Sequence, residues 1–83
     1  MTTIRVGAMV QDQEILTGER DVTSYHRDLY WAVSKGEGRD YRVGRVVCDR
    51  TGEPIYLADF STACHFDNLD DAIISYRKIV GRE

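Results

Sequence analysis

Apolar and polar residues alternate at the beginning of the chain, and this alternation predicts a β-strand over residues 2–11. One face of the strand would carry Ile4, Val6, Ala8 and Val10. Residues 12–22 are less regular, because Ile15 and Leu16 fit either a short return strand or a loop anchored by two apolar side chains. The pattern leaves this segment open between strand and loop.

A helix is predicted over residues 23–36 from the spacing of its apolar residues. Thr23 or Ser24 can cap its first turn, since either hydroxyl can accept a hydrogen bond from a backbone N–H, and Gly36 is a common terminator. At about 100° per residue, one apolar stripe contains Tyr25, His26, Leu29, Ala32 and Val33. This stripe would pack against the sheet.

Trp31, the only tryptophan of the chain, would point away from that stripe. On the helical projection it lies about 200° from Leu29, beside Arg27, with Tyr30 at the edge of the stripe. Three structures can cover its indole: residues 12–22 of the same chain, a second copy of the chain, or another protein. Because Trp, Tyr and Arg dominate the energetics of protein interfaces, this trio predicts a binding surface.

A β-hairpin is predicted in the second half of the chain. Its strands would be the valine-rich residues 41–48 and residues 54–60. Thr51-Gly52 would join them, because glycine readily adopts the positive φ of a tight turn.

The last predicted element is a helix capped by Asp67 or Asn68. Acidic residues lie in its first turn and basic residues near its end, in agreement with the helix dipole. Its apolar stripe would contain Leu69, Ala72, Ile73, Tyr76 and Val80, with Ile74 off the stripe.

These elements together predict an α+β fold in a single domain covering residues 1–83. The expected architecture is a small antiparallel sheet of three or four strands with two helices packed on one face, in the order β(β)αββα. Both apolar helix stripes and the apolar faces of the strands would then be buried together.

Composition and charge narrow the function classes. The net charge of -3 disfavours direct binding of nucleic acid, which depends on clustered Lys and Arg. Two cysteines, Cys48 and Cys64, are fewer than a small secreted scaffold needs, which favours a reducing, cytoplasmic location. No apolar run is long enough for a signal peptide or a membrane span, so we expect no membrane partner.

Catalytic and metal-binding patterns are weak. Cys64 and His65 are adjacent, and neighbours in an extended segment point to opposite sides, so they are poorly placed for proton transfer. His26 could supply the base only if the fold brought it there. The cysteines and histidines lack the close paired spacing of structural zinc sites. We therefore expect no catalytic residue, metal or cofactor.

The resulting hypothesis is a non-enzymatic protein-binding module. Its candidate binding residues are Arg27, Tyr30 and Trp31, framed by the acidic residues Asp12, Glu14 and Glu19. The partner would be another protein. A host nucleic-acid-binding complex is one candidate, because an acidic surface can occupy a basic channel.

In general character, a small acidic chain without motifs resembles phage-encoded inhibitors of host defence, anti-CRISPR proteins among them. No residues match a particular family. Two other function classes stay open: a small enzyme or ligand-binding domain using Cys64, His65 or His26, and a homo-oligomeric structural subunit such as a homodimer.

Overall fold

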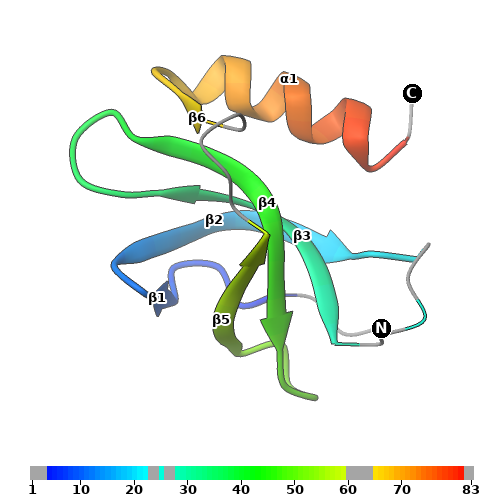
Figure 1. Cartoon of the computed structure of the whole chain (residues 1–83). Helices are drawn as coiled ribbons and strands as arrows, with labels where there is room; N and C mark the ends of the chain where they lie inside the picture. Colours follow the sequence, from blue (N-terminus) through cyan, green and yellow to red (C-terminus); the bar gives the residue numbers. More distant parts are fainter. Residues whose placement is uncertain (1–3, 23–24, 26–27, 60–64, 82–83) are drawn as a thin grey trace.

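The computed structural model describes residues 4–22, 25, 28–59 and 65–81. In this part of the chain the elements are β1 (Met9–Val10), β2 (Gln13–Arg20), β3 (Leu29–Lys35), β4 (Tyr41–Cys48), β5 (Pro54–Asp59), β6 (His65–Phe66) and α1 (Leu69–Ile79). Strands β1 to β5 pair antiparallel in sequence order, and β6 pairs with the first residues of β4. The sheet curls into a nearly closed barrel, and α1 lies across one end of its outer side (Figure 1).

The predicted α+β fold with two helices is wrong, because the segment predicted as the first helix contains the strand β3. Tyr30 and Ala32 belong to the barrel interior, whereas Trp31 and Val33 face outward. Both faces of β3 are covered over much of its length, so apolar residues occur on both. The alternation that marks a half-buried strand is therefore missing, and the apolar run also fits a helical stripe. Residues 23–24 and 26–27 of that prediction lie outside the described residues.

The barrel interior is filled by a cluster of small and medium apolar side chains. Its buried members are Ile4, Val10, Ile15, Tyr30, Ala32, Val46 and Cys48, with Leu57 packed against them. Gly18 allows this packing, since a Cβ there would lie 2.6 Å from the carbonyl oxygen of Trp31 and 2.8 Å from Cγ2 of Ile4. The close approach of β2 and β3 thus depends on glycine, which has no side chain, at position 18.

The beginning of the chain differs from the predicted strand over residues 2–11. Among its described residues only Met9–Val10 form a strand, and Val6 is exposed because the chain turns at Gly7, whose φ is +89°. Residues 12–22 follow the strand alternative, as β2. The turn between β1 and β2 places Gln11 and Asp12 at φ 47° and 66°.

Hydrogen bonds from one side chain and from the backbone link the two ends of the nearly closed barrel, which are the segment around β1 and the β4–β5 hairpin. The side-chain Oε1 of Gln11 accepts a hydrogen bond from the backbone N–H of Leu57 in β5, at 2.7 Å. The backbone N–H of Arg5 donates to the carbonyl oxygen of Gly52 at 2.9 Å, and its guanidinium pairs with Glu53. The N-terminal segment is thereby held against the β4–β5 hairpin.

The hairpin and the final helix are confirmed where they are described. Asn68 caps α1, with its Oδ1 accepting a hydrogen bond from the backbone N–H of Asp71. Ala72 and Tyr76 are buried with Val33 and Val43 of the sheet. The stripe is wrong at its first position, because Leu69 is exposed, and right in excluding Ile74. Within the described residues, no helix has the length and apolar character needed to cross a membrane.

Candidate functional site

Trp31 lies in the middle of β3 and points to the outer side of the barrel, where it is partly buried. Its cross-strand neighbours are Glu19 on β2 and Arg45 on β4. The guanidinium carbon of Arg45 lies 5.5 Å from the centroid of the indole ring, a distance typical of a cation–π contact. The indole is therefore held by a cation and still reaches the surface.

Asp21 completes this arrangement from the end of β2. Its side chain is only 4% exposed, and its Oδ2 lies 3.6 Å from Nη1 of Arg45. The backbone N–H of Asp21 donates to the carbonyl oxygen of Leu29, which holds it beside the start of β3. A carboxylate at this depth needs a compensating charge, and Arg45 supplies one. Asp21 and Trp31 thus both orient Arg45.

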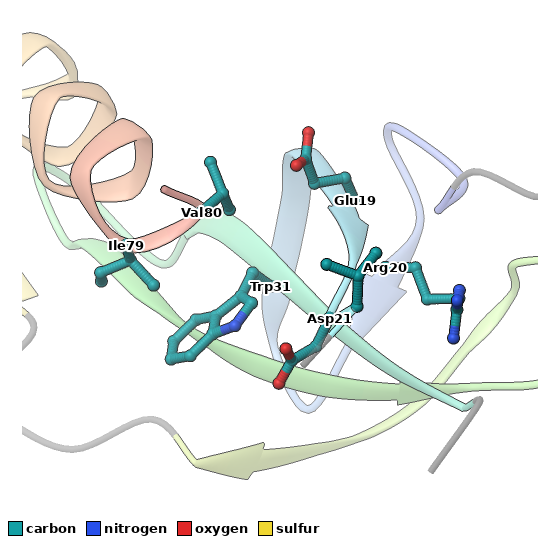
Figure 2. A pocket seen from close by; sticks show the side chains of 7 residues that line it. Glu19, Arg20, Asp21, Trp31, Ile79 and Val80 are labelled. Carbon is teal, nitrogen blue, oxygen red and sulfur yellow. The ribbon is translucent and has the colours of Figure 1, made fainter. Parts of the chain in front are cut away.

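A hollow of about 120 Å³ opens between the end of α1 and the end of β2 (Figure 2). We call it the Trp31 notch; its lining residues are Glu19, Arg20, Asp21, Val22, Trp31, Ile79 and Val80. Pockets for small-molecule ligands usually measure about 300–1,000 Å³. The notch has the size for one side chain of a partner rather than for a whole substrate.

Beyond the end of α1, the outer side of the sheet stays apolar. Leu29, Val47 and Tyr56 stand opposite one another across β3, β4 and β5, one row beyond Trp31. A bulge in β5 places Ile55 without a partner between two paired residues. As a result the neighbours Ile55 and Tyr56 are both exposed, by 56% and 51%. We call Leu29, Val47, Ile55 and Tyr56, together with Trp31, the open face.

The predicted site residues do not come together as one surface. Tyr30 cannot join it, because its side chain is 2% exposed inside the barrel, where burial raises its pKa. Glu19 lies beside Trp31, as a cross-strand neighbour. Asp12 and Glu14 instead border a separate shallow hollow at the other end of β2. Arg27 lies outside the described residues.

Sequence reasoning missed most of the surface around Trp31. Arg45 and Val47 carried a usable signal, since alternation places them on one face of a correctly predicted strand. Ile55 and Tyr56 carried no such signal, because no residue pattern in this part of the sequence marks the bulge in β5. Ile79 was missed because it lies just outside the predicted helix stripe.

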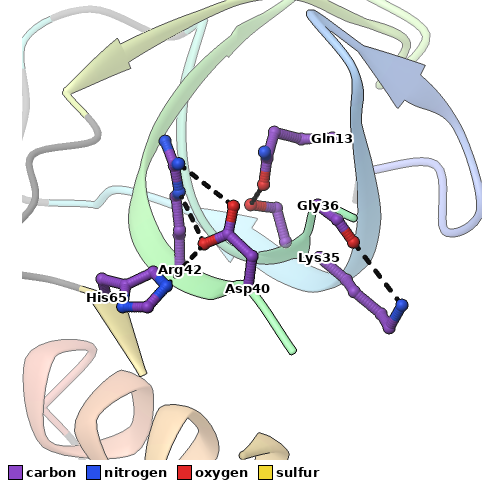
Figure 3. Close-up of polar contacts among 7 residues, drawn as sticks. Gln13, Lys35, Gly36, Asp40, Arg42 and His65 are labelled. Atoms are coloured by element: carbon purple, nitrogen blue, oxygen red, sulfur yellow. Dashed lines mark hydrogen bonds and ion pairs between the residues drawn. The ribbon is translucent and has the colours of Figure 1, made fainter. Parts of the chain in front are cut away.

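A second polar cluster surrounds Asp40, at the turn before β4 (Figure 3). The two oxygens of its carboxylate accept hydrogen bonds from Nε and Nη2 of Arg42, at 3.0 and 3.1 Å. Nε2 of His65 lies 2.8 Å from Oδ1. The hydrogen bonds from Arg42 lower the pKa of Asp40, and partial burial opposes them. The cluster joins β6, and hence the start of α1, to β4.

The Asp40–His65 pair has the form of a catalytic dyad, but no described side chain beside it is a suitable nucleophile. Ser34 is fully buried, and its hydroxyl donates to Oε1 of Gln13 at 2.9 Å. Cys48 lies in the barrel interior, where burial raises its thiol pKa to about 12. Within the described residues, no three His, Cys, Asp or Glu side chains are placed to share a metal ion. Cys64 and His26 lie outside these residues.

Comparison with known proteins adds no relative to this picture. No family model, no curated protein and no solved structure matches the chain.

Proposed function

We propose that this chain is a non-enzymatic protein-binding module that binds its partner through the open face. The observation that carries the proposal is that α1 covers only one end of the outer sheet surface. Beyond α1, the apolar side chains of Ile55 and Tyr56 are exposed, and those of Leu29 and Val47 are half-buried. A contiguous apolar patch on a small domain is typical of an interaction site.

The residue types of the open face support a protein partner. Trp31 and Tyr56 belong to the types that most often supply binding energy, and Arg45, which borders the open face as the cross-strand neighbour of Trp31, is already oriented by Asp21 and the indole. Side chains held in place before binding lose less entropy on association. The small volume of the Trp31 notch also favours a protruding side chain over a small-molecule ligand.

The kind of protein that the open face binds is also part of this proposal. A host nucleic-acid-binding complex in the cytoplasm, inhibited by the small acidic chain, is compatible with its net charge of -3. The role of a phage-type inhibitor rests on size and charge alone. The proposal of an open-face partner does not depend on it.

Two exposed isoleucines provide a matched test. Ile55 on the open face and Ile74 on the outer side of α1 are 56% and 53% exposed. We expect Ile55→Asp to abolish capture of the partner from native cytosol, with a loss of affinity of about thirtyfold, the level of an interface hot spot. Ile74→Asp should capture it normally. Thermal melting of both variants checks that each is folded.

Several outcomes would contradict the proposal. One is equal capture by Ile55→Asp and the unchanged chain, and another is selective loss with Ile74→Asp. A concentration-dependent dimer in sedimentation experiments, broken only by Ile55→Asp, would instead assign the open face to a second copy of the chain.

A further inference from the structure

The sheet surface under α1 continues directly into the open face. α1 packs on Val33 of β3 and Val43 of β4, which pair with each other. Leu29 and Val47, the pair at the centre of the open face, lie four residues further along the same two strands. Side chains an even number of residues apart point to the same side of a regular strand. The interface of α1 and the open face therefore belong to one continuous surface.

The distance between these two pairs leaves room for a second helix beside α1. Four residues of a strand span about 13 Å, and the axes of neighbouring helices lie about 8–10 Å apart. A helix at that distance from α1 would pass over the sheet between the Trp31–Arg45 pair and the Leu29–Val47 pair. Trp31, which packs on the α1 side and is still partly accessible, would then be covered from both sides.

The width of the open face also fits a helix. Leu29, Val47 and Tyr56 form a row across three adjacent strands, and two strand spacings amount to about 10 Å. Residues i and i+7 on one face of a helix are separated by about 10.5 Å along its axis. Two helical turns with apolar residues at i, i+3 or i+4, and i+7 would therefore span the row.

Addition of a partner strand is less suited to this surface, because an added strand needs free backbone groups at a sheet edge. Strands β3 and β4 pair on both sides. At β5 the N-terminal segment already uses edge groups: the N–H of Leu57 donates to Oε1 of Gln11, and the carbonyl oxygen of Gly52 accepts from the N–H of Arg5. A helix satisfies its own backbone and binds through side chains, which are what the open face presents.

We propose that the open face binds an amphipathic α-helix of the protein partner, packed beside α1 on the same sheet. Its apolar face would contact Leu29, Val47 and Tyr56, and its polar face would point to solvent, as in other helix-in-groove complexes. The inference rests on the proposed function and names the structural element that the partner supplies.

The first test asks which peptide conformation binds. Random sixteen-residue peptides without tryptophan are displayed on phage and selected on the whole chain. Peptides that lose binding to Ile55→Asp but bind Ile74→Asp are kept as open-face ligands. Alanine scanning of each peptide should find its essential apolar residues at i, i+3 or i+4, and i+7.

A matched pair of substitutions in the peptide then tests the helix directly. Proline at a non-essential central position should weaken binding about a hundredfold, because proline in a helix interior costs about 3 kcal/mol. α-Aminoisobutyrate at the same position favours a helix and should leave binding intact.

The second test places the peptide beside α1. Trp31 is the only tryptophan, so its fluorescence reports whether the peptide covers the accessible side of the indole. Binding should shift its emission to shorter wavelength and lower its quenching constant for iodide about twofold, since a covered side chain loses contact with water and solutes. The same peptide concentration should leave the emission of Ile55→Asp unchanged.

The outcomes separate this inference from the proposed function. Essential residues at every second position, or equal binding by the proline variant, would overturn the helix and leave the open face as a binding surface. A bound open-face ligand that leaves the emission of Trp31 unchanged would overturn the position beside α1. Selection of no open-face ligand would contradict both proposals.

Discussion

The bulge in β5 decides which side chains form the open face, and it can be tested by comparing Tyr56 with Leu57. In the observed register Val47 pairs with Tyr56 and Val46 with Leu57. Val46 belongs to the barrel interior, so Leu57 points inward and Tyr56 outward. A regular ladder continued from the Cys48–Pro54 pair would instead place Tyr56 opposite Val46 and inside the barrel.

The two registers make opposite predictions for truncation to alanine. Complete burial of a large apolar side chain contributes about 1.5–3 kcal/mol. Tyr56 is 51% exposed, so Tyr56→Ala should lower the free energy of unfolding by only about 1 kcal/mol. Leu57 packs against the interior cluster, so Leu57→Ala should cost about 2–3 kcal/mol, the lower part of the range for core cavities.

Urea unfolding followed by the fluorescence of Trp31 measures both values. Ile74→Ala provides the benchmark for an exposed apolar residue, because Ile74 is 53% exposed on α1. Tyr56→Ala should resemble this benchmark. A larger loss for Tyr56→Ala than for Leu57→Ala would refute the bulge and remove Tyr56 from the proposed surface.

Three further predictions concern the framework that holds this surface. Gly18→Ala should cost about 1–3 kcal/mol in urea unfolding, because the new Cβ meets backbone that cannot move aside; an unchanged midpoint would show that β2 and β3 do not approach so closely. Gly52→Val should cost about 1–3 kcal/mol, because a β-branched residue is strained at the φ of +88° found there, and an unaltered melting temperature would contradict the turn. The lowered pKa of Asp40 means that its ionised form stabilises the fold above the unfolded-state pKa of about 4, and that this contribution is lost as pH falls through the lower folded value. Asp40→Asn should therefore flatten the acid side of a stability–pH curve, and an identical acid limb in both proteins would contradict the role of Arg42.

The sequence by itself determined the elements whose signals are local. Asn68, the acidic first turn and the basic last turn are sufficient to recognise α1, because capping and dipole interactions act within one helix. The β4–β5 hairpin was recognisable because its signal is also local: two apolar runs are joined by a short turn that contains a glycine. The position of Ile74 outside the core also followed from the helical period alone.

Only the tertiary structure decided the state of residues 29–35 and the composition of the open face. β3 is buried by the barrel on one side and, over part of its length, by α1 on the other, so its sequence lacks the alternation by which a strand is recognised. Trp31 is partly accessible because α1 ends beside it, and not because it opposes a helical stripe. Tyr56 reaches the surface through a bulge that depends on pairing with β4. These features arise from contacts between segments far apart in the chain, which local patterns do not encode.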